Sequence, residues 1–251
     1  MSDIQNVYQL DNPIFNNAVD RIVMHIYHRK QTAQDKVYMF CGCAPRVGNT
    51  TLAISAAVNM AKSGWSTLLI DADMRKDARY KRMNRSKNNL ASYLEHPGAE
   101  LSALMQRTNH ESLHYIAAGT AQSNPVQLLC AERMQALLAY ARGKYDFIFI
   151  DVAAPVVVAD ACVLAPMVDD VALITAWDDT TSAQMRATQA ELTAAGANIM
   201  GVVINRMDVR AYKRHNQDAS YFVNKEYMQT KGLRLMRRKG GAEDGKPKGK
   251  S

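Results

Sequence analysis

The apolar positions of this chain fall into short runs separated by longer amphipathic stretches. The runs are continuous rather than alternating, which is typical of strands in a parallel sheet whose two faces are both covered by helices. The stretches between them repeat their apolar residues with the spacing of a helix. The predicted strands span residues 37–41, 67–70, 113–117, 145–150, 171–175 and 199–204.

Several helix boundaries are marked by capping residues. Asn124 and Pro125 form a cap and first-turn pair, and Thr181 is a second candidate N-cap. Gly64 and Gly196 follow two of the stretches, at positions where glycine favours helix termination. The predicted helices span residues 13–30, 51–63, 125–142 and 182–195, and the first is expected to pack through Ile14, Val19, Ile22, Val23 and Ile26.

Strands that alternate with helices in this order predict an α/β fold. We expect a doubly wound, mainly parallel sheet with helices on both faces, and ligands bind such sheets at the carboxyl ends of the strands. The chain divides into an N-terminal segment and helix (residues 1–35), the α/β domain (36–208) and a basic C-terminal tail (209–251).

The net charge of +7 is concentrated at the end of the chain. Residues 206–251 contain 13 Lys/Arg and 5 Asp/Glu, a balance of +8, whereas residues 1–205 contain 18 and 19, a balance of −1. A neutral body with a basic tail argues against a nucleic-acid-binding face and for an interaction tail. An anionic membrane surface attracts such a tail by about 1 kcal/mol per basic residue. The composition of residues 239–251 predicts disorder.

No run of 18 apolar residues occurs and the N-terminus is polar, so we predict neither a membrane span nor a signal peptide. The expected location is the cytoplasm, with the basic tail suited to peripheral contact at the inner face of the membrane. The four cysteines, Cys41, Cys43, Cys130 and Cys162, lie among apolar residues and lack the spacing of a zinc site. We expect all four to be reduced filler, since free cysteine behaves as a small hydrophobe.

A candidate phosphate-binding loop follows the first strand. Such loops read G-x-x-x-x-G-K-[ST], and Gly48 and Thr50 occupy the second glycine and the hydroxyl positions. Cys43 stands at the first glycine and Asn49 at the lysine. The loop N–H groups and the helix N-terminus that follows can form an anion cradle without any side chain, and Thr50 can hold Mg²⁺. Without the other motifs, the segment is also consistent with a plain strand-to-helix turn.

Carboxylates follow two other predicted strands. Asp71 and Asp73 lie two residues apart after the second strand, and Asp151 ends an apolar run of the Walker B type. Hard cations such as Mg²⁺ prefer oxygen ligands of this kind. Each motif alone is a common polar strand end, but the order of loop, paired aspartates and strand-ending aspartate predicts a nucleotide site.

These motifs resemble those of bacterial tyrosine kinases, the BY-kinases of CpsD/CapB type in the MinD/ParA branch of P-loop ATPases. The family's Walker A has the form P-G-E-G-K-S/T, and Pro45–Thr50 occupy those positions. Leu68–Lys76 are similar to its L-L-I-D-A-D-x-R-x motif, and Tyr145–Pro155 to its Y-D-x-I-I-I-D-x-P-P strand, with Ala154 in place of the first proline. Gly119–Leu129, Asp160-Ala161 and Gly201–Asn205 extend the resemblance, which covers roughly residues 10–208.

The resemblance implies ATP or ADP and Mg²⁺ as ligands. It implies that Asp71, Asp73 and Asp151 serve phosphoryl transfer, and that Thr50, Asp71 and Asp151 hold the metal. It implies transfer to tail tyrosines, usually on a neighbouring subunit of a homo-oligomer, and a membrane-embedded polysaccharide co-polymerase (chain-length regulator) as partner in trans. The implied nucleotide-binding residues are Pro45, Arg46, Val47, Gly48, Asn49, Thr50, Thr51 and Asn205, the last against adenine.

The loop departs from the family at the residues that matter most for charge. Asn49 donates hydrogen bonds but has no positive charge, and loss of a comparable electrostatic stabiliser costs on the order of 10²–10³ in rate. Val47 replaces an acidic residue, and Arg46 replaces a glycine and is expected to resist a positive φ. We therefore expect nucleotide binding to survive better than catalysis.

Two further departures concern assembly and acceptors. The family's N-terminal helix carries E-x-x-R-x-x-R, which docks subunits into a ring, but Asn17, Asp20 and Val23 occupy those positions. Ring assembly through this docking motif is therefore not expected.

The candidate phosphate acceptors are the tail tyrosines Tyr212, Tyr221 and Tyr227, which are irregularly spaced.

The leading hypothesis is a BY-kinase-like regulator of capsule or exopolysaccharide synthesis with impaired phosphotransfer, acting as a pseudokinase-like scaffold. One alternative is an active tyrosine autokinase that uses a relocated cation. A second is a ParA/MinD-like ATPase, although Ala44 stands where those proteins place a lysine in K-G-G-x-G-K-T. A third is a structural domain without ligand. The candidate relocated cations are Arg46, Arg75, Lys76 and Arg79.

Overall fold

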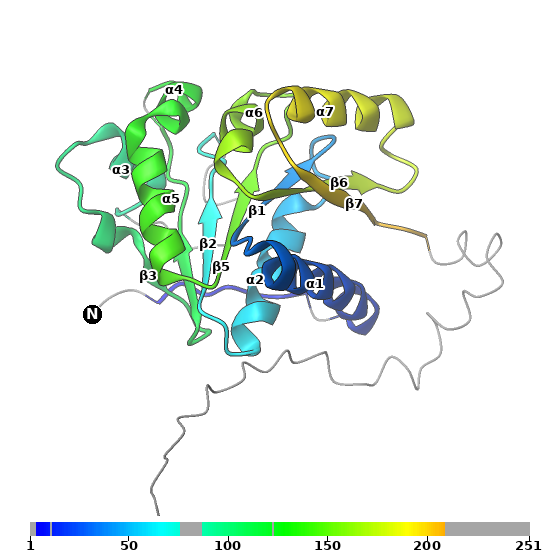
Figure 1. Ribbon diagram of the computed structural model, residues 1–251, viewed down its shortest axis with the longest axis horizontal. Coiled ribbons are helices and arrows are strands. Elements are labelled where there is room, and N and C mark those ends of the chain that lie inside the picture. Colours follow the sequence, from blue (N-terminus) through cyan, green and yellow to red (C-terminus); the bar gives the residue numbers. More distant parts are fainter. Residues whose placement is uncertain (1–3, 11, 76–86, 122, 209–251) are drawn as a thin grey trace, which may run out of the picture.

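The computed structural model describes residues 4–10, 12–75, 87–121 and 123–208. This part of the chain folds around a seven-stranded sheet of order β3-β4-β2-β5-β1-β6-β7, parallel throughout except for the pairing of β3 with β4 (Figure 1). The predicted doubly wound, mainly parallel sheet is confirmed. The strands are β1 Val37–Gly42, β2 Thr67–Asp71, β3 Gln106–Arg107, β4 Leu113–Ile116, β5 Phe147–Val152, β6 Asp170–Ala176 and β7 Ile199–Asn205.

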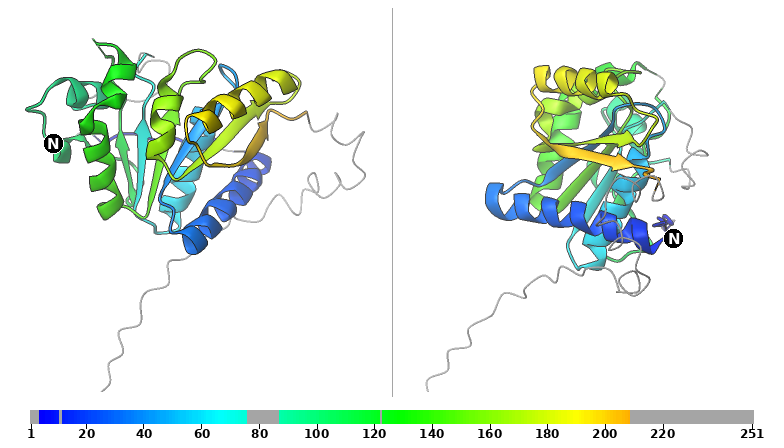
Figure 2. Two further views of the ribbon diagram at one scale, coloured as in Figure 1. Left: turned by 45° about the horizontal axis from the view of Figure 1, so that its top comes forward. Right: turned by 90° about the vertical axis from the view of Figure 1, so that its right-hand side faces the viewer.

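Helices cover both faces of the sheet, which lies between them in Figure 2. One core packs α1 and α2 against one face, and a second core packs the remaining helices against the other. Short 3₁₀ turns lie at Leu101–Leu104 and Ala165–Met167. The helices are α1 Pro13–Ala33, α2 Asn49–Lys62, α3 Leu90–Glu95, α4 Pro125–Cys130, α5 Glu132–Lys144, α6 Asp160–Leu164 and α7 Ser182–Ala194.

The central strands β1, β2, β5 and β6 are buried along their whole length, as their continuous apolar runs predict. The edge strand β7 is different. The strand predicted at residues 199–204 is confirmed, but the prediction that it is buried is wrong, because Val202 is 44% exposed and Ile204 57% exposed. An edge position explains this, because β7 pairs only with β6 among the described strands.

The predicted capping residues are confirmed, but one predicted helix is in fact two. The Thr181 side chain caps α7 in a capping box with Gln184, and Asn124 accepts a hydrogen bond from the N–H of Val126. Gly64 and Gly196 have φ of 86° and 92°. The prediction of one helix over residues 125–142 is wrong, because Ala131 takes an extended conformation with ψ of 149° and separates α4 from α5. No glycine or proline marks this break in the sequence.

Helix α1 packs against α2 through Val19, Val23 and Ile26, which are all fully buried. Ile14 is 41% exposed, so its predicted place in the packed face is wrong. It lies in the first turn of the helix, directly after the Asn12 cap. The buried stripe thus begins one turn later than predicted.

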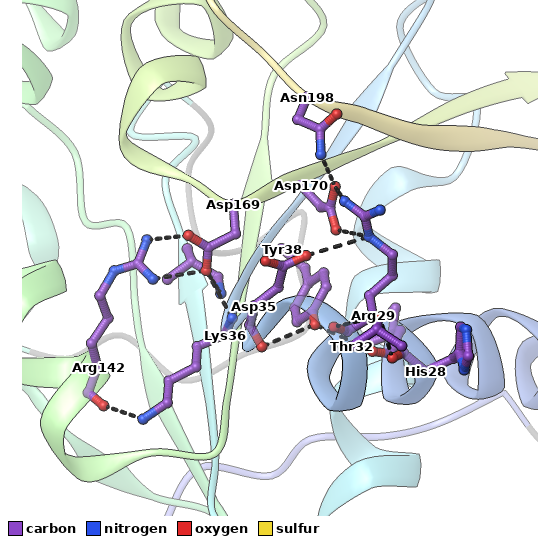
Figure 3. Close-up of polar contacts among 12 residues, drawn as sticks. His28, Arg29, Thr32, Asp35, Lys36, Tyr38, Arg142, Asp169, Asp170 and Asn198 are labelled. Carbon is purple, nitrogen blue, oxygen red and sulfur yellow. Dashed lines mark hydrogen bonds and ion pairs between the residues drawn. The ribbon is translucent and has the colours of Figure 1, made fainter.

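Arginine–aspartate pairs fasten the amino ends of the strands to the helices (Figure 3). Arg29 of α1 donates from Nε and from a terminal nitrogen to the two oxygens of Asp170, both at 2.7 Å. Arg142 of α5 donates to both oxygens of Asp169, again at 2.7 Å. Asp35 lies 3.3 Å from Arg29 Nε. We call these five residues the amino-edge cluster.

The cysteines do not all share one environment. Cys41 and Cys43 are buried in and after β1, and Cys162 is partly buried. Cys130 is exposed, so its predicted role as core filler is wrong. It ends α4 just before the extended Ala131, where the chain leaves the helix. All four carry free thiols, as predicted.

Candidate nucleotide site

The segments that follow β1, β2 and β5 lie together because these strands are neighbours in the sheet. Asp71, at the end of β2, is the register partner of Asp151 in β5. Asp151 is also opposite Phe40 of β1, from which the loop of residues 43–48 leads into α2. The fold therefore gathers the three predicted motifs at one place, which we call the carboxyl edge.

Two residues of the loop have positive φ angles. Gly48 has φ of 102° and Arg46 has φ of 62°. The expectation that Arg46 resists a positive φ is therefore wrong, although a non-glycine residue in this region costs roughly 1–2 kcal/mol. The N–H groups of residues 47–51 have no hydrogen-bond acceptor among the described residues. Val47 is buried, whereas Pro45, Arg46 and Thr51 are exposed and Gly48, Asn49 and Thr50 are half-buried.

The Asn49 side chain turns toward the end of β5. Its Nδ2 donates to Asp151 Oδ1 at 2.8 Å and to the main-chain oxygen of Val152 at 2.9 Å. A primary amide has two N–H donors, so both are used by these contacts. A phosphate group could receive a hydrogen bond from the Asn49 amide only if one of them broke.

The Asp71 carboxylate is held at both oxygens. Oδ1 accepts from the N–H of Asp73 at 3.1 Å, and Oδ2 accepts from the Tyr115 hydroxyl at 3.3 Å. Burial, together with the nearby negative charges of Asp71 and Asp151, raises the pKa of Tyr115 well above its usual value. The phenol therefore stays a neutral donor. Sequence reasoning missed Tyr115, because a tyrosine inside an apolar strand is typical of the core.

Arg75, one of the candidate relocated cations, binds another carboxylate. Its guanidinium donates to Asp160 Oδ2, and Asp160 is fully buried. Burial raises the pKa of Asp160, while Arg75 opposes that shift. Arg75 is thus engaged at the start of α6. Lys76 and Arg79 lie outside the described residues.

Asn205 and Arg206 reach the loop from the end of β7. Asn205 Nδ2 donates to the main-chain oxygen of Val47 at 2.8 Å, and the Arg206 guanidinium donates to the main-chain oxygen of Arg46. Asn205 was a predicted nucleotide contact, and the described contacts place it against the loop backbone. Sequence reasoning missed Arg206, because one arginine before a basic tail carries no distinguishing signal.

The donor set suits Mg²⁺, although a site would not be complete without the nucleotide. Among the described residues, no group of three or more His, Cys, Asp and Glu side chains is arranged to hold a metal ion. Magnesium in nucleotide sites is usually bound by one or two carboxylates together with waters and phosphate oxygens. The Thr50 hydroxyl in the first turn of α2 and the register pair Asp71 and Asp151 fit that pattern. Bound there, the ion would neutralise phosphate charge.

Sequence comparisons place the chain beside kinases. A family model described as an AAA domain matches residues 44–211. The putative tyrosine-protein kinase EpsB of Ralstonia solanacearum is 30% identical over 73% of this chain and 24% of its own length. Tyrosine-protein kinase CpsD of Streptococcus pneumoniae is 28% identical over 71% of this chain and 79% of its own. The chain thus spans about a quarter of the longer relatives that it matches.

Solved structures agree in fold. The kinase domain of the Escherichia coli tyrosine kinase ETK has a TM-score of 0.70 and 26% identity, with 77% of each chain covered. The septum site-determining protein MinD of Pyrococcus horikoshii, complexed with Mg-ADP, has a TM-score of 0.57 and 18% identity over 75% of this chain and 77% of its own. The second match shows the fold alone, which is that of MinD-like P-loop proteins. Among the described helices, none is both long and apolar enough to cross a bilayer.

Proposed function

The chain belongs to the AAA domain family, and on that premise we propose that it is a bacterial tyrosine kinase-like regulator of capsule or exopolysaccharide synthesis with impaired phosphotransfer. The observation that carries the proposal is the neutral Asn49 amide, which occupies the lysine position of the loop and is bound to Asp151 and Val152. Several relatives are named as tyrosine-protein kinases, one of them in a cps region. These names support the polysaccharide context.

The chemical reason is the missing charge. Phosphoryl transfer depends on positioning and on neutralising the charge that spreads over the transferred group. An amide supplies hydrogen bonds without charge, and the Asn49 donors already serve β5. We therefore place the largest loss at the transfer step rather than at binding.

We propose that the loop still takes ATP or ADP with Mg²⁺, weakly. Residues 45–51 would surround the phosphates, and their backbone would supply most of the donors. The Thr50 hydroxyl with Asp71 and Asp151 would hold the metal, and Asp71, Asp73 and Asp151 would serve any residual transfer. The open N–H groups of residues 47–51 support this assignment, since such groups at a helix N-terminus favour anions.

The alternative of an active autokinase needs a cation close to the phosphates. Arg75 is bound to the buried Asp160, so it would have to leave that carboxylate uncompensated in order to serve. Leaving a buried charge without its partner is strongly unfavourable. This cost disfavours Arg75 as the relocated cation. A MinD-like ATPase role has support from the fold alone.

We propose a membrane-embedded polysaccharide co-polymerase as the partner in trans. Ring assembly through the N-terminal helix has no support in the contacts of α1. Asp20 accepts a hydrogen bond from Asn59 of α2 at 2.6 Å, and Val23 is fully buried. Two of the three positions that carry the docking motif in the resemblance thus face the same chain. Any homo-oligomer would use another surface.

The proposed domain organisation keeps residues 36–208 as the kinase-like domain and residues 209–251 as a basic tail. The tail and its tyrosines, Tyr212, Tyr221 and Tyr227, lie outside the described residues. We propose a cytoplasmic protein whose tail contacts the anionic inner face of the membrane. The tail's excess of Lys and Arg supports this.

The test is phosphotyrosine formation by the purified chain with ATP and Mg²⁺, with Asp71→Ala as the matched control. We expect the chain and the control to give the same low signal. Robust autophosphorylation that is lost in Asp71→Ala would overturn the proposal. If Arg46→Ala or Arg75→Ala abolished that activity as well, the relocated-cation alternative would take its place.

A further inference from the structure

We propose that Asn205 and Arg206 are positioning residues that hold the phosphate loop in its anion-binding shape. We call this pair the β7 clamp. The inference rests on the proposed function, because the anion it concerns is the phosphate of the bound nucleotide. It differs from the adenine contact that the resemblance implies for Asn205, since it assigns the side chain to the loop backbone.

Asn205 is fixed on both sides. Its main-chain oxygen accepts from the N–H of Trp177, which follows β6, at 2.8 Å. Its side-chain Nδ2 donates to the main-chain oxygen of Val47 at 2.8 Å. A Cβ atom added to Gly48 would overlap that same nitrogen. The absence of a side chain at Gly48 therefore gives the Asn205 amide the room to reach the loop.

Arg206 extends the clamp by one residue. Its φ of 54° lies in the left-handed region, and its guanidinium donates to the main-chain oxygen of Arg46. Asp179, 3.9 Å from the same guanidinium, steadies it only weakly because both side chains are more than half exposed. Two consecutive loop carbonyls, those of residues 46 and 47, are thus bound from β7.

The geometry of the peptide bond turns these two contacts into a consequence for ligand binding. In a trans peptide the C=O and the N–H of the next residue point in opposite directions. Holding the oxygens of Arg46 and Val47 toward β7 therefore directs the N–H groups of Val47 and Gly48 away from β7. Those N–H groups have no acceptor among the described residues. The clamp thus presents two donors and keeps two carbonyl oxygens from facing an anion.

The clamp also stabilises the unusual backbone conformation of the loop. Arg46 and Gly48 both have positive φ, at 62° and 102°. Arg46 in that region is unfavourable on its own. The hydrogen bonds from Asn205 and Arg206 stabilise the peptide units between these two residues, so the loop keeps its shape without the glycine that Arg46 replaces.

The first experiment measures the affinity of two probes, Mg-ADP and Mg-pyrophosphate, for the chain and for Asn205→Ala. Pyrophosphate has no adenine. If Asn205 positions the loop, the substitution weakens both probes by a similar factor, about five- to tenfold. If Asn205 acts through adenine, only ADP is weakened and the proposal is overturned. Arg186→Ala, at an exposed position of α7, serves as the control and should leave both affinities within about twofold.

Arg206 gives a second, graded comparison. Arg206→Ala should weaken both probes, and Arg206→Lys, which keeps a charge and a donor, should restore most of the affinity. Equal affinity of all three proteins for pyrophosphate would remove Arg206 from the clamp. This result would leave the role of Asn205 to be decided by its own variant.

A measurement without ligand separates this inference from the proposed function. Amide order parameters of Val47 and Gly48 from NMR relaxation should fall from rigid-backbone values of about 0.85 toward about 0.6 in Asn205→Ala. Unchanged order parameters would overturn the clamp even if nucleotide binds. Conversely, failure of the unmodified chain to bind either probe would reject the proposed nucleotide site and leave the clamp to this test.

A double-mutant cycle covers the case of a poorly folded single variant. Gly48→Ala collides with the Asn205 amide, so it should lower the melting temperature more in the unmodified chain than in the Asn205→Ala background. Equal shifts in both backgrounds would show that the two residues do not couple. That outcome would contradict the contact on which the proposal depends.

Discussion

Aspartates gather at both edges of the sheet, and the chemistry of the groups around them differs. At the amino edge, Asp169 and Asp170 each receive two hydrogen bonds from an arginine of the same chain (Figure 3). At the carboxyl edge, Asp71 accepts from a backbone amide and the Tyr115 hydroxyl, and Asp151 accepts from the Asn49 amide. Arginines donate to Asp169 and Asp170 at the first edge, whereas an amide N–H, a phenol and a side-chain amide donate to Asp71 and Asp151 at the second.

The charge of the donors decides how much negative charge remains at each edge. Bidentate pairs of arginine and carboxylate are strong and geometrically specific, and those at the amino edge join α1, α5 and β6 into one body. Hydrogen bonds from neutral groups orient a carboxylate without cancelling its charge. In the function proposed above, the carboxylates of the carboxyl edge would hold a cation, and Asn49 stands at the loop position where the resemblance implies a lysine.

Of the substitutions that test this comparison, Asp170→Ala is expected to lower the free energy of unfolding the most. The Asp170 side chain is fully buried and accepts from Arg29 and from Asn198. Asp170→Ala removes the bidentate acceptor of Arg29 and leaves that arginine with Asp35, 3.3 Å from its Nε. Loss of hydrogen bonds to a charged group should lower the free energy of unfolding by about 1.5–3 kcal/mol. Denaturant unfolding measures it. The exposed Asp179→Ala is the control and should stay within about 0.5 kcal/mol. Equal losses would mean that the amino edge is not a structural anchor.

A smaller, pH-dependent effect is expected at Asp35. Burial, with a hydrogen bond to Asp170 and the negative charges of Asp170 and Asp169, raises the pKa of Asp35 to about 6, and Arg29 opposes the shift. A raised carboxyl pKa means that the folded state binds the proton more tightly than the unfolded state. The resulting stabilisation is complete below the unfolded pKa of about 3.9 and is lost as the pH rises through about 6.

The Asp35→Asn side chain does not titrate, so the stability of the variant does not depend on pH through this group. Relative to the unmodified chain, the variant should therefore gain roughly 1–2 kcal/mol between pH 4.5 and pH 8, since one unit of pKa shift corresponds to about 1.4 kcal/mol. Thermal unfolding across this range measures the difference. If the difference in stability between the two proteins stayed constant with pH, the raised pKa of Asp35 would be contradicted.

The smallest stability effect is expected at Tyr115. Tyr115→Phe removes the hydroxyl that donates to Asp71 and keeps the ring in the core, so about 1 kcal/mol of unfolding free energy should be lost. Nucleotide affinity should become less dependent on Mg²⁺, because Asp71 is less firmly oriented. Tyr145→Phe is a matched control, since its hydroxyl has no hydrogen-bond partner among the described residues. Identical behaviour of the two variants would remove Tyr115 from the site.

The sequence predicts those parts of the molecule in which local pattern and tertiary structure agree. The fully buried strands β1, β2, β5 and β6 leave continuous apolar runs, and α7 has its capping residues. Burial of β7 and continuity of the helix through Ala131 depend on neighbours distant in the chain, and both predictions fail. Tyr115, Arg206 and the amino-edge cluster are also unmarked, because the partners of these side chains come together only through the sheet order.

The loop shows the same limit in one place. Gly48, Asn49 and Thr50 follow from spacing alone, but the positive φ of Arg46 does not. A glycine was expected to be needed there. The structure instead supplies two hydrogen bonds from the end of β7, more than 150 residues away in sequence.

The affinity of Mg-ADP for the Asn49→Lys variant, relative to the unmodified chain, tests the central claim most directly. Isothermal titration calorimetry should show measurable, weak binding by the unmodified chain and binding about 10- to 100-fold tighter by the variant, since a hydrogen bond from a charged donor contributes about 1.5–3 kcal/mol. Equal affinities would contradict the account, because they would mean that the neutral amide at position 49 does not limit what the loop can hold.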